Sequence, residues 1–211
     1  MKTHVTFVLD SSGSMEQVAE DTKGGFNSFL RDQRNEPGTA TVTLYEFDTD
    51  VELVYRNYPT ADAPELDEDN YTPSGRTALH DALYRAVTET VEGIDETDLE
   101  ERPDNVVIVV LTDGKENASE THPERVREQV EIRREEDGVE FLFIGANQDA
   151  ALTAGRVGID ADRSLDMARS GDGARAAYDS TSERVSEVRR GGSTDGFDEA
   201  DRKQQEDARD R

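Results

Sequence analysis

The sequence predicts one α/β domain with a three-layer, Rossmann-like, doubly wound sheet that is mostly parallel and has one antiparallel edge strand. Three observations support this prediction. Short apolar runs end in turn residues, amphipathic helical patterns lie between these runs, and one closely spaced pair of strand patterns is typical of a hairpin. Strands that alternate with helices are typical of a parallel sheet covered by helices on both faces.

Three apolar runs predict the central strands. Each is short, rich in β-branched or aromatic residues and bounded by turn residues, as strands buried on both faces are. They cover residues 5–9, 105–112 and 141–144. Two further segments alternate between apolar and polar residues, and the short connection between them suits a hairpin. They cover residues 41–47 and 51–55, and we expect the second to be the antiparallel edge strand. Residues 163–167 fit a last short strand.

Helical patterns lie between these strands. They cover residues 15–34, 78–91, 123–136, 149–157 and 171–190. The clearest apolar stripe is that of residues 78–91, and Gly93 follows it as a stop signal. The pair Gly24-Gly25 is a weak point in the first helix, because glycine lowers helix propensity.

Charge leaves two interpretations open at the level of composition. The 211 residues include 49 Asp and Glu against 24 Lys and Arg, a formal net charge of -25 that is typical either of a disordered chain or of a very acidic surface. The apolar residues gather in the predicted strands, which favours a folded domain over residues 1–190. Residues 191–211 are predicted to be an acidic, disordered tail. The loop over residues 57–76 is unusually long, and such loops are often functional.

The same composition excludes several classes of protein. An excess of acids argues against nucleic-acid binding, and the absence of cysteine excludes disulfides and thiolate metal sites. The apolar run at residues 106–111 is far shorter than the ~18 residues needed to cross a bilayer. The segment before Asp10 is too short for a signal peptide, so we expect a cytoplasmic protein without membrane insertion. Only four lysines stand against twenty arginines, a pattern that resembles proteins of halophiles, although an acidic mesophilic protein is the alternative.

Oxygen-bearing side chains gather where the predicted strands end. Asp10, Ser12 and Ser14 follow the first strand, Asp113 follows the strand at residues 105–112, and Thr77 precedes a helix. Ligands of doubly wound sheets bind at the carboxyl ends of strands, so these five side chains are predicted to meet. An all-oxygen set favours Mg²⁺, with Mn²⁺ or Ca²⁺ as alternatives. Two carboxylates leave such a cation electrophilic and open to a further carboxylate.

The residues themselves resemble a known family. The run Asp-Ser-Ser-Gly-Ser-Met at residues 10–15 matches the D-x-S-x-S-M signature of von Willebrand factor A-type (VWA) domains with a metal-ion-dependent adhesion site. Thr77 and Asp113, the latter within Leu-Thr-Asp-Gly, match the family's later ligands, and the resemblance covers roughly residues 1–190. Residues 143–150 also resemble stand-alone microbial VWA proteins.

The resemblance implies a non-enzymatic protein-binding module. It implies that Ser12, Ser14 and, in an open state, Thr77 bind the cation directly, and that Asp10 and Asp113 bind it directly or through water. A protein partner would then supply an Asp or Glu to the metal. By family analogy, that partner belongs to an AAA+ ATPase system or an assembly process.

Other interpretations of these residues remain at this point. Ser14 with Gln17 fits a capping box, Thr77 fits a helix N-cap, and Asp113 followed by glycine fits an ordinary turn. Residues 115–117 either shape the rim of the site or form a plain exposed loop.

The alternative function is a Mg²⁺-dependent phosphoryl-transfer hydrolase with Asp10 as the nucleophile. Against it, Ser12 stands where such enzymes usually have a second aspartate. The sequence also has no phosphate-binding loop of the Gly-x-x-x-x-Gly-Lys-Ser/Thr type.

Overall fold

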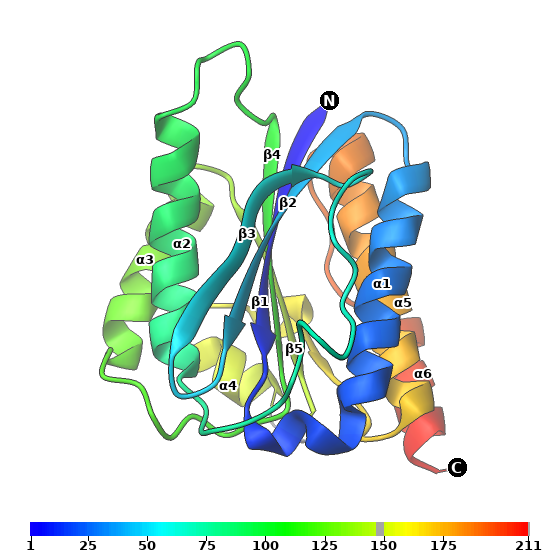
Figure 1. Cartoon of the computed structure of the whole chain (residues 1–211). Coiled ribbons are helices and arrows are strands. Elements are labelled where there is room, and N and C mark those ends of the chain that lie inside the picture. Colours follow the sequence, from blue (N-terminus) through cyan, green and yellow to red (C-terminus); the bar gives the residue numbers. More distant parts are fainter. Residues whose placement is uncertain (147–149, 211) are drawn as a thin grey trace.

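The computed structural model describes residues 1–146 and 150–210, and these residues form a six-stranded sheet between two helical layers (Figure 1). The strand order is β3-β2-β1-β4-β5-β6. All neighbouring strands are parallel except the β2–β3 pair at one edge, so the predicted fold class is confirmed. The strands are β1 (Lys2–Asp10), β2 (Thr39–Phe47), β3 (Val51–Pro59), β4 (Asn105–Thr112), β5 (Glu140–Gly145) and β6 (Ser164–Asp166).

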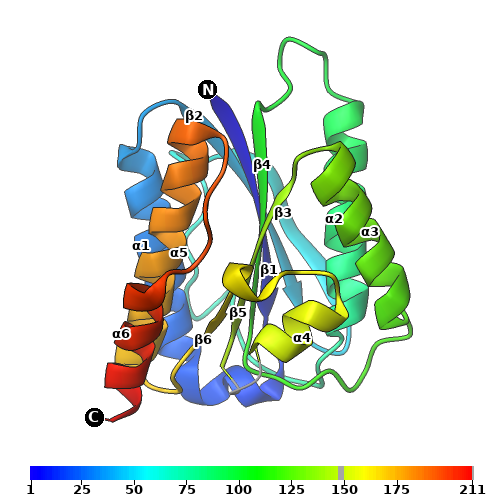
Figure 2. The ribbon, with the colours of Figure 1, turned by 180° about the vertical axis from the view of Figure 1, so that it is seen from behind.

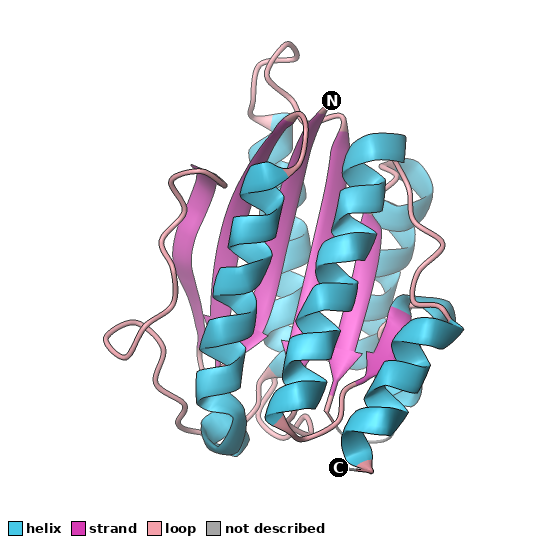
Figure 3. Ribbon diagram, turned by 90° about the vertical axis from the view of Figure 1, so that its right-hand side faces the viewer, coloured by secondary structure: helices cyan, strands magenta, loops and turns pink. Residues whose placement is uncertain are grey.

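Helices cover both faces of the sheet. On one face lie α1 (Ala19–Asn35), α5 (Gly171–Gly191) and α6 (Glu199–Arg209), and all three face the viewer in Figure 3. On the other face lie α2 (Leu79–Asp95), α3 (Pro123–Glu136) and α4 (Ala150–Arg156), which Figure 2 shows from behind. Two short 3₁₀ helices, η1 (Gly13–Val18) and η2 (Ala161–Arg163), complete the elements. Among the described residues, no helix is long and apolar enough to cross a membrane.

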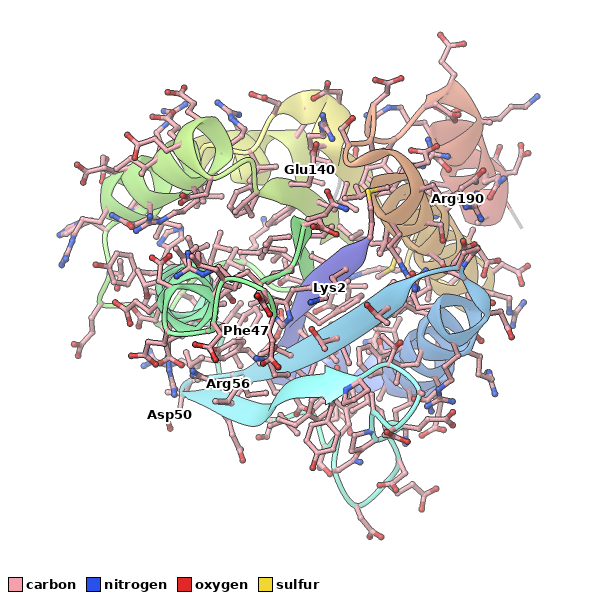
Figure 4. The ribbon with its side chains drawn as sticks, turned by 90° about the horizontal axis from the view of Figure 1, so that it is seen from above. Lys2, Phe47, Asp50, Arg56, Glu140 and Arg190 are labelled. Atoms are coloured by element: carbon pink, nitrogen blue, oxygen red, sulfur yellow. The ribbon has the colours of Figure 1, made fainter. Side chains whose placement is uncertain are left out.

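The sheet therefore divides two apolar cores. Alternate residues of β1 enter different layers: Phe7 packs under α1 and α5, and Val8 packs under α2. The Phe7 ring contacts those of Phe26 and Phe29 at centroid distances of 5.2 and 4.9 Å. Seen from above, side chains fill the space between the sheet and both layers, and Lys2 marks the end of the sheet at which β1 begins (Figure 4).

Neither the weak point at Gly24-Gly25 nor the stop signal at Gly93 ends a helix. The first helix continues through Gly24 and Gly25. Glycine at position 25 serves packing, because a Cβ there would overlap the Tyr178 ring of α5. Helix α2 continues past Gly93 to Asp95. The first helix does begin later than expected, because residues 13–18 form the 3₁₀ turn η1.

The expectation of a disordered tail over residues 191–211 is wrong for the described part of that segment. Residues 199–209 form α6, which begins with a capping box in which Asp198 and Asp201 each accept from the other's backbone N–H. The buried Arg184 of α5 donates to the Gly196 carbonyl and lies 4.0 Å from the carboxylates of both aspartates. Two acidic residues of this segment, Asp198 and Asp201, therefore lie near a buried cation.

The topology places the reversal of strand order between β1 and β4. These strands are adjacent and parallel, with Leu9 opposite Leu111, so both carboxyl ends open at the edge where η1 begins, at the bottom of Figure 1. The long connection between β3 and α2 packs back onto the core through Ala63, Leu66 and Tyr71, which are all buried. It therefore forms an ordered wall beside this edge.

Candidate metal centre

The five predicted ligands come together at the carboxyl edge of the sheet. The hydroxyl oxygens of Ser12 and Ser14 lie 3.0 Å apart. Both serines line a hollow of about 330 Å³ together with Thr77 and Asp113. Asp10 does not line the hollow but lies next to Gly114, which does: a Cβ added to Gly114 would lie 3.0 Å from Asp10 Oδ2 and still closer to Thr77 Oγ1. Strand ends and loops that are distant in sequence thus bring the oxygen set together.

Asp10 is fully buried and firmly held. Its Oδ1 accepts from the Ser12 backbone N–H at 2.7 Å, and its Oδ2 accepts from the Thr112 hydroxyl at 2.5 Å. Burial raises the pKa of Asp10 above its ordinary value, these hydrogen bonds oppose the rise, and the nearby charge of Asp113 adds to it. The Tyr71 hydroxyl, from the β3–α2 connection, donates to the Asp10 carbonyl at 2.6 Å. The site therefore concentrates negative charge that a cation would offset.

Thr77 is held by a residue of the facing loop. The Thr77 N–H donates to Asn117 Oδ1 at 3.0 Å, and the Asn117 N–H donates back to the Thr77 carbonyl at 3.0 Å. Asn117 therefore helps to shape the site. Of the two interpretations of residues 115–117, a rim of the site or a plain exposed loop, the first holds for Asn117. Glu116 supports the same loop by accepting from the N–H groups of His80, Ala118 and Ser119.

The capping interpretations of the serine and threonine are not met. The N-cap of α2 is Ala78 rather than Thr77, and no side chain caps this helix. Helix η1 likewise has no side-chain cap, so Ser14 and Gln17 form no capping box in the described structure. The hydroxyls of Ser14 and Thr77 therefore cap no helix and line the hollow, where the Ser14 hydroxyl also bonds that of Ser12.

Two glycines let the loops approach each other. Gly75 has a φ of +66°, which favours glycine, and a Cβ there would lie 2.7 Å from Asp48 Oδ2. Its carbonyl accepts from the Gly13 N–H at 3.3 Å, which joins the loop before α2 to the serine loop. Gly114 leaves the space in which Thr77 Oγ1 and Asp10 Oδ2 lie.

An arginine that the sequence analysis missed contacts the site. Arg169, in the connection between β6 and α5, donates through one nitrogen to Asp113 Oδ2 at 2.8 Å and to the Asp113 carbonyl at 3.2 Å. Asp113 is buried, whereas Arg169 is exposed. No motif surrounds Arg169, so only the tertiary structure reveals this pair.

The donor set fits a hard divalent cation. The side chains offer two carboxylates and three hydroxyls, and no cluster of three or more His, Cys, Asp or Glu side chains suited to a metal occurs among the described residues. Oxygen donors of this kind suit Mg²⁺ better than zinc or copper, which prefer nitrogen and sulfur. The open hollow leaves room for water or for a ligand at the cation.

Comparison with known proteins gives a family match and a partly matching curated protein. The family model of the von Willebrand factor type A domain matches residues 4–187. Part of the chain is similar to human inter-alpha-trypsin inhibitor heavy chain H3, with 30% identity over 133 residues. That match covers 60% of this chain and 14% of the human protein, so the chain spans a small part of the curated relatives it matches.

Solved structures share the fold at low identity. A mutant PilB minor pilin from Streptococcus sanguinis gives a TM-score of 0.64 at 13% identity, and the match covers 88% of this chain and 62% of the pilin. Proximal thread matrix protein 1 from the mussel byssus gives 0.61 at 17% identity, over 87% of this chain and 46% of that protein. The metal-ion-dependent adhesion site of that mussel protein is occupied by zinc. The segment resembling microbial proteins, residues 143–150, includes residues 147–149, which lie outside the described structure.

Proposed function

The chain belongs to the von Willebrand factor type A family, and on that premise we propose that it is a non-enzymatic module that binds a protein partner through a divalent cation. We propose Mg²⁺ as the cation, held by Asp10, Ser12, Ser14, Thr77 and Asp113. The bound cation would supply an open coordination position for an Asp or Glu carboxylate of the partner.

One observation carries this proposal. Hydroxyls of three separate sequence positions line one open hollow above a buried carboxylate, with no helix cap to account for them. The hydroxyls of Ser12 and Ser14 bond each other at 3.0 Å, which leaves each with further capacity to bind a ligand in the hollow that they line. Two carboxylates only just balance a dication, which leaves it able to attract a third.

The hydrolase alternative fits the structure less well. A nucleophilic Asp10 would need an open approach to one carboxylate oxygen, yet its exposed fraction is 0% and each oxygen accepts a hydrogen bond. Position 12 also carries a serine, where hydrolases of this kind usually have a second aspartate that acts as an acid or base. These observations favour binding over phosphoryl transfer.

The charge of the chain supports a proposal about the setting of the protein. Only three acidic side chains in the described part of the chain are buried, those of Asp10, Asp113 and Asp201, so nearly all of the net charge of -25 lies on the surface. We propose that this surface suits a halophilic cytoplasm, where high salt screens like charges. An AAA+ ATPase system as partner, and a microbial stand-alone role, stay predictions from the family resemblance.

Calorimetric titration of Mg²⁺ into the purified chain tests the proposal. We expect saturable binding to the wild type, and a loss of about 10-fold or more in affinity for Ser12→Ala. The matched control is Ser11→Ala, because the neighbouring serine, as far as the structure describes the chain, does not line the hollow and bonds to Phe47 and Ser74 through its backbone. Absent Mg²⁺ binding, or equal losses in both variants, would contradict the assigned ligands.

A phosphatase assay with and without Mg²⁺ separates the two functions. We expect no turnover above that of Asp10→Ala. Mg²⁺-dependent turnover that Asp10→Ala abolishes would overturn the binding-only proposal.

A further inference from the structure

The hollow above the candidate metal site differs in charge from the rest of the molecule. Ten of the described residues line it, of which three are cations and one is an acid, in a chain with twice as many acids as cations. The acid is Asp113, which pairs with one of the cations. The cations are Arg76, Lys115 and Arg169.

We propose that Arg76, Lys115 and Arg169 form a cationic rim that binds a second acidic group of the same partner. The partner segment would then carry several carboxylates, one for the cation and at least one more for the rim. This inference rests on the proposed function and adds the chemistry of the partner to it.

The three cations come from three loops that meet at the site. Arg76 directly precedes Thr77, Lys115 directly follows Gly114, and Arg169 reaches Asp113 from the β6–α5 connection. All three side chains belong to exposed residues. Within the described ranges, Arg76 and Lys115 form no ion pair, so their charge is available to a ligand.

Distance decides which charges a ligand at the site experiences. The Debye length is about 8 Å at physiological ionic strength and about 3 Å at 1 M salt. The acidic residues on remote surfaces are largely screened from the hollow, whereas the rim would contact a ligand directly. Guanidinium groups also bind carboxylates through paired hydrogen bonds, which strengthens recognition where water is partly excluded.

Arg169 has a second effect, because it pairs with a proposed metal ligand. Its guanidinium competes with the cation for Asp113, so removing it should strengthen Mg²⁺ binding. The same guanidinium would bind the partner's carboxylate, so removing it should weaken peptide binding. A residue with only a structural role would not produce these opposite changes.

Fluorescence anisotropy with two labelled peptides tests the rim. Both are acetylated and amidated octapeptides, one with eight glutamates and one with a single glutamate among seven glutamines. At saturating Mg²⁺ we expect the wild type to bind the octaglutamate about 10-fold more tightly, a difference of about 1.4 kcal/mol. The triple variant Arg76→Gln, Lys115→Gln, Arg169→Gln should lose most of this preference.

A second triple variant controls for net charge. Arg127→Gln, Arg175→Gln, Lys203→Gln removes three exposed cations from α3, α5 and α6, away from the hollow, and should keep the preference. Arg169→Gln alone should raise Mg²⁺ affinity in calorimetry while lowering octaglutamate affinity.

The outcomes separate this inference from the proposed function. If the wild type binds Mg²⁺ but shows no octaglutamate preference, or if both triple variants lose it equally, the rim is overturned and the metal site stands. A fall in Mg²⁺ affinity in Arg169→Gln would contradict the claim that Arg169 competes with the cation for Asp113. Tighter binding of an oligodeoxythymidine of the same length would overturn the assignment to protein carboxylates. If the wild type binds no Mg²⁺, the proposed function fails first and the rim falls with it.

Discussion

The two ends of β1 both bury polar side chains beside a hollow, but they use them differently. At the amino end, His4 is 4% exposed, its Nδ1 lies 2.8 Å from the Thr41 hydroxyl, and its Nε2 lies 3.1 Å from the Thr6 hydroxyl. The Thr6 hydroxyl in turn bonds Thr90 of α2 at 2.8 Å. At the carboxyl end, the hydroxyls of Ser12 and Ser14 bond each other and line an open hollow.

This difference shows that a hollow by itself does not indicate a site. The hollow at the amino end has a volume of about 230 Å³ and His4 in its lining, yet both ring nitrogens of His4 are already bonded. Burial lowers the pKa of His4 to about 4, so its ring is neutral at pH 7. Polar groups satisfied inside the protein stabilise the fold, whereas groups directed into a hollow leave capacity for a ligand.

Gly114→Ala should disrupt the proposed metal site at the carboxyl end of β1. The new Cβ would displace Thr77 Oγ1 and crowd Asp10 Oδ2, so we expect Mg²⁺ affinity to fall by about 100-fold. Because Thr77 is a side chain that can rotate, the fold should survive, which circular dichroism and thermal denaturation would check. The control is Gly155→Ala in α4, where an added Cβ would meet nothing within 4 Å. Unchanged Mg²⁺ binding in Gly114→Ala would remove Thr77 and Asp10 from the proposed site.

His4→Ala, at the amino end of β1, should lower stability and leave Mg²⁺ binding unchanged. It leaves a cavity and removes the partner of Thr41, so we expect the free energy of unfolding to fall by about 2 kcal/mol. Mg²⁺ affinity of the folded variant should stay unchanged, because His4 lies at the other end of β1. Chemical denaturation and calorimetry give the two values, with exposed His122→Ala as the control. A change in Mg²⁺ affinity would show that the two ends are coupled.

The sequence predicts the site best where its residues directly follow a strand. Asp10 and Asp113 were predicted to meet because each follows a buried apolar run, and neighbouring parallel strands end at the same edge. Arg169 was missed because its contact with Asp113 joins residues 56 positions apart and no local pattern marks it. Contacts of this kind depend on how the β6–α5 connection packs, which periodicity does not encode.

The prediction of disorder for the C-terminal segment, residues 191–211, is wrong for a related reason. Its composition is typical of disorder, yet Gln205 donates to the Gly173 carbonyl and accepts from the Ala168 N–H, which ties α6 to the connection beside Arg169. Composition sums charges along the chain and takes no account of the buried Arg184 that offsets them. The composition shows that the segment is acidic, but not that Asp198 and Asp201 lie near Arg184 of α5.

Glu46 offers the smallest and most specific test of the comparison, because it is a half-buried carboxyl at the carboxyl end that does not line the hollow. It lies opposite Leu9 in the β1–β2 register, and its Oε1 has no hydrogen-bond partner among the described residues. Burial, and secondly the charge of Glu52, raise the pKa of Glu46 to about 8. We therefore expect Glu46 to affect stability rather than ligand binding.

The folded-state pKa of Glu46 lies above the ordinary value of 4.5, so the folded state holds the proton more tightly. The stabilisation from this proton is complete below pH 4.5 and is lost as the pH rises towards 8. Glu46→Gln mimics the protonated form, so its melting temperature should exceed that of the wild type at pH 8 and match it near pH 4.5. Glu52→Gln should give a smaller gain at pH 8, because that charge is the lesser cause. A gain that is equal at both pH values would show that folding does not raise the pKa of Glu46, and a change in Mg²⁺ affinity would place Glu46 in the site after all.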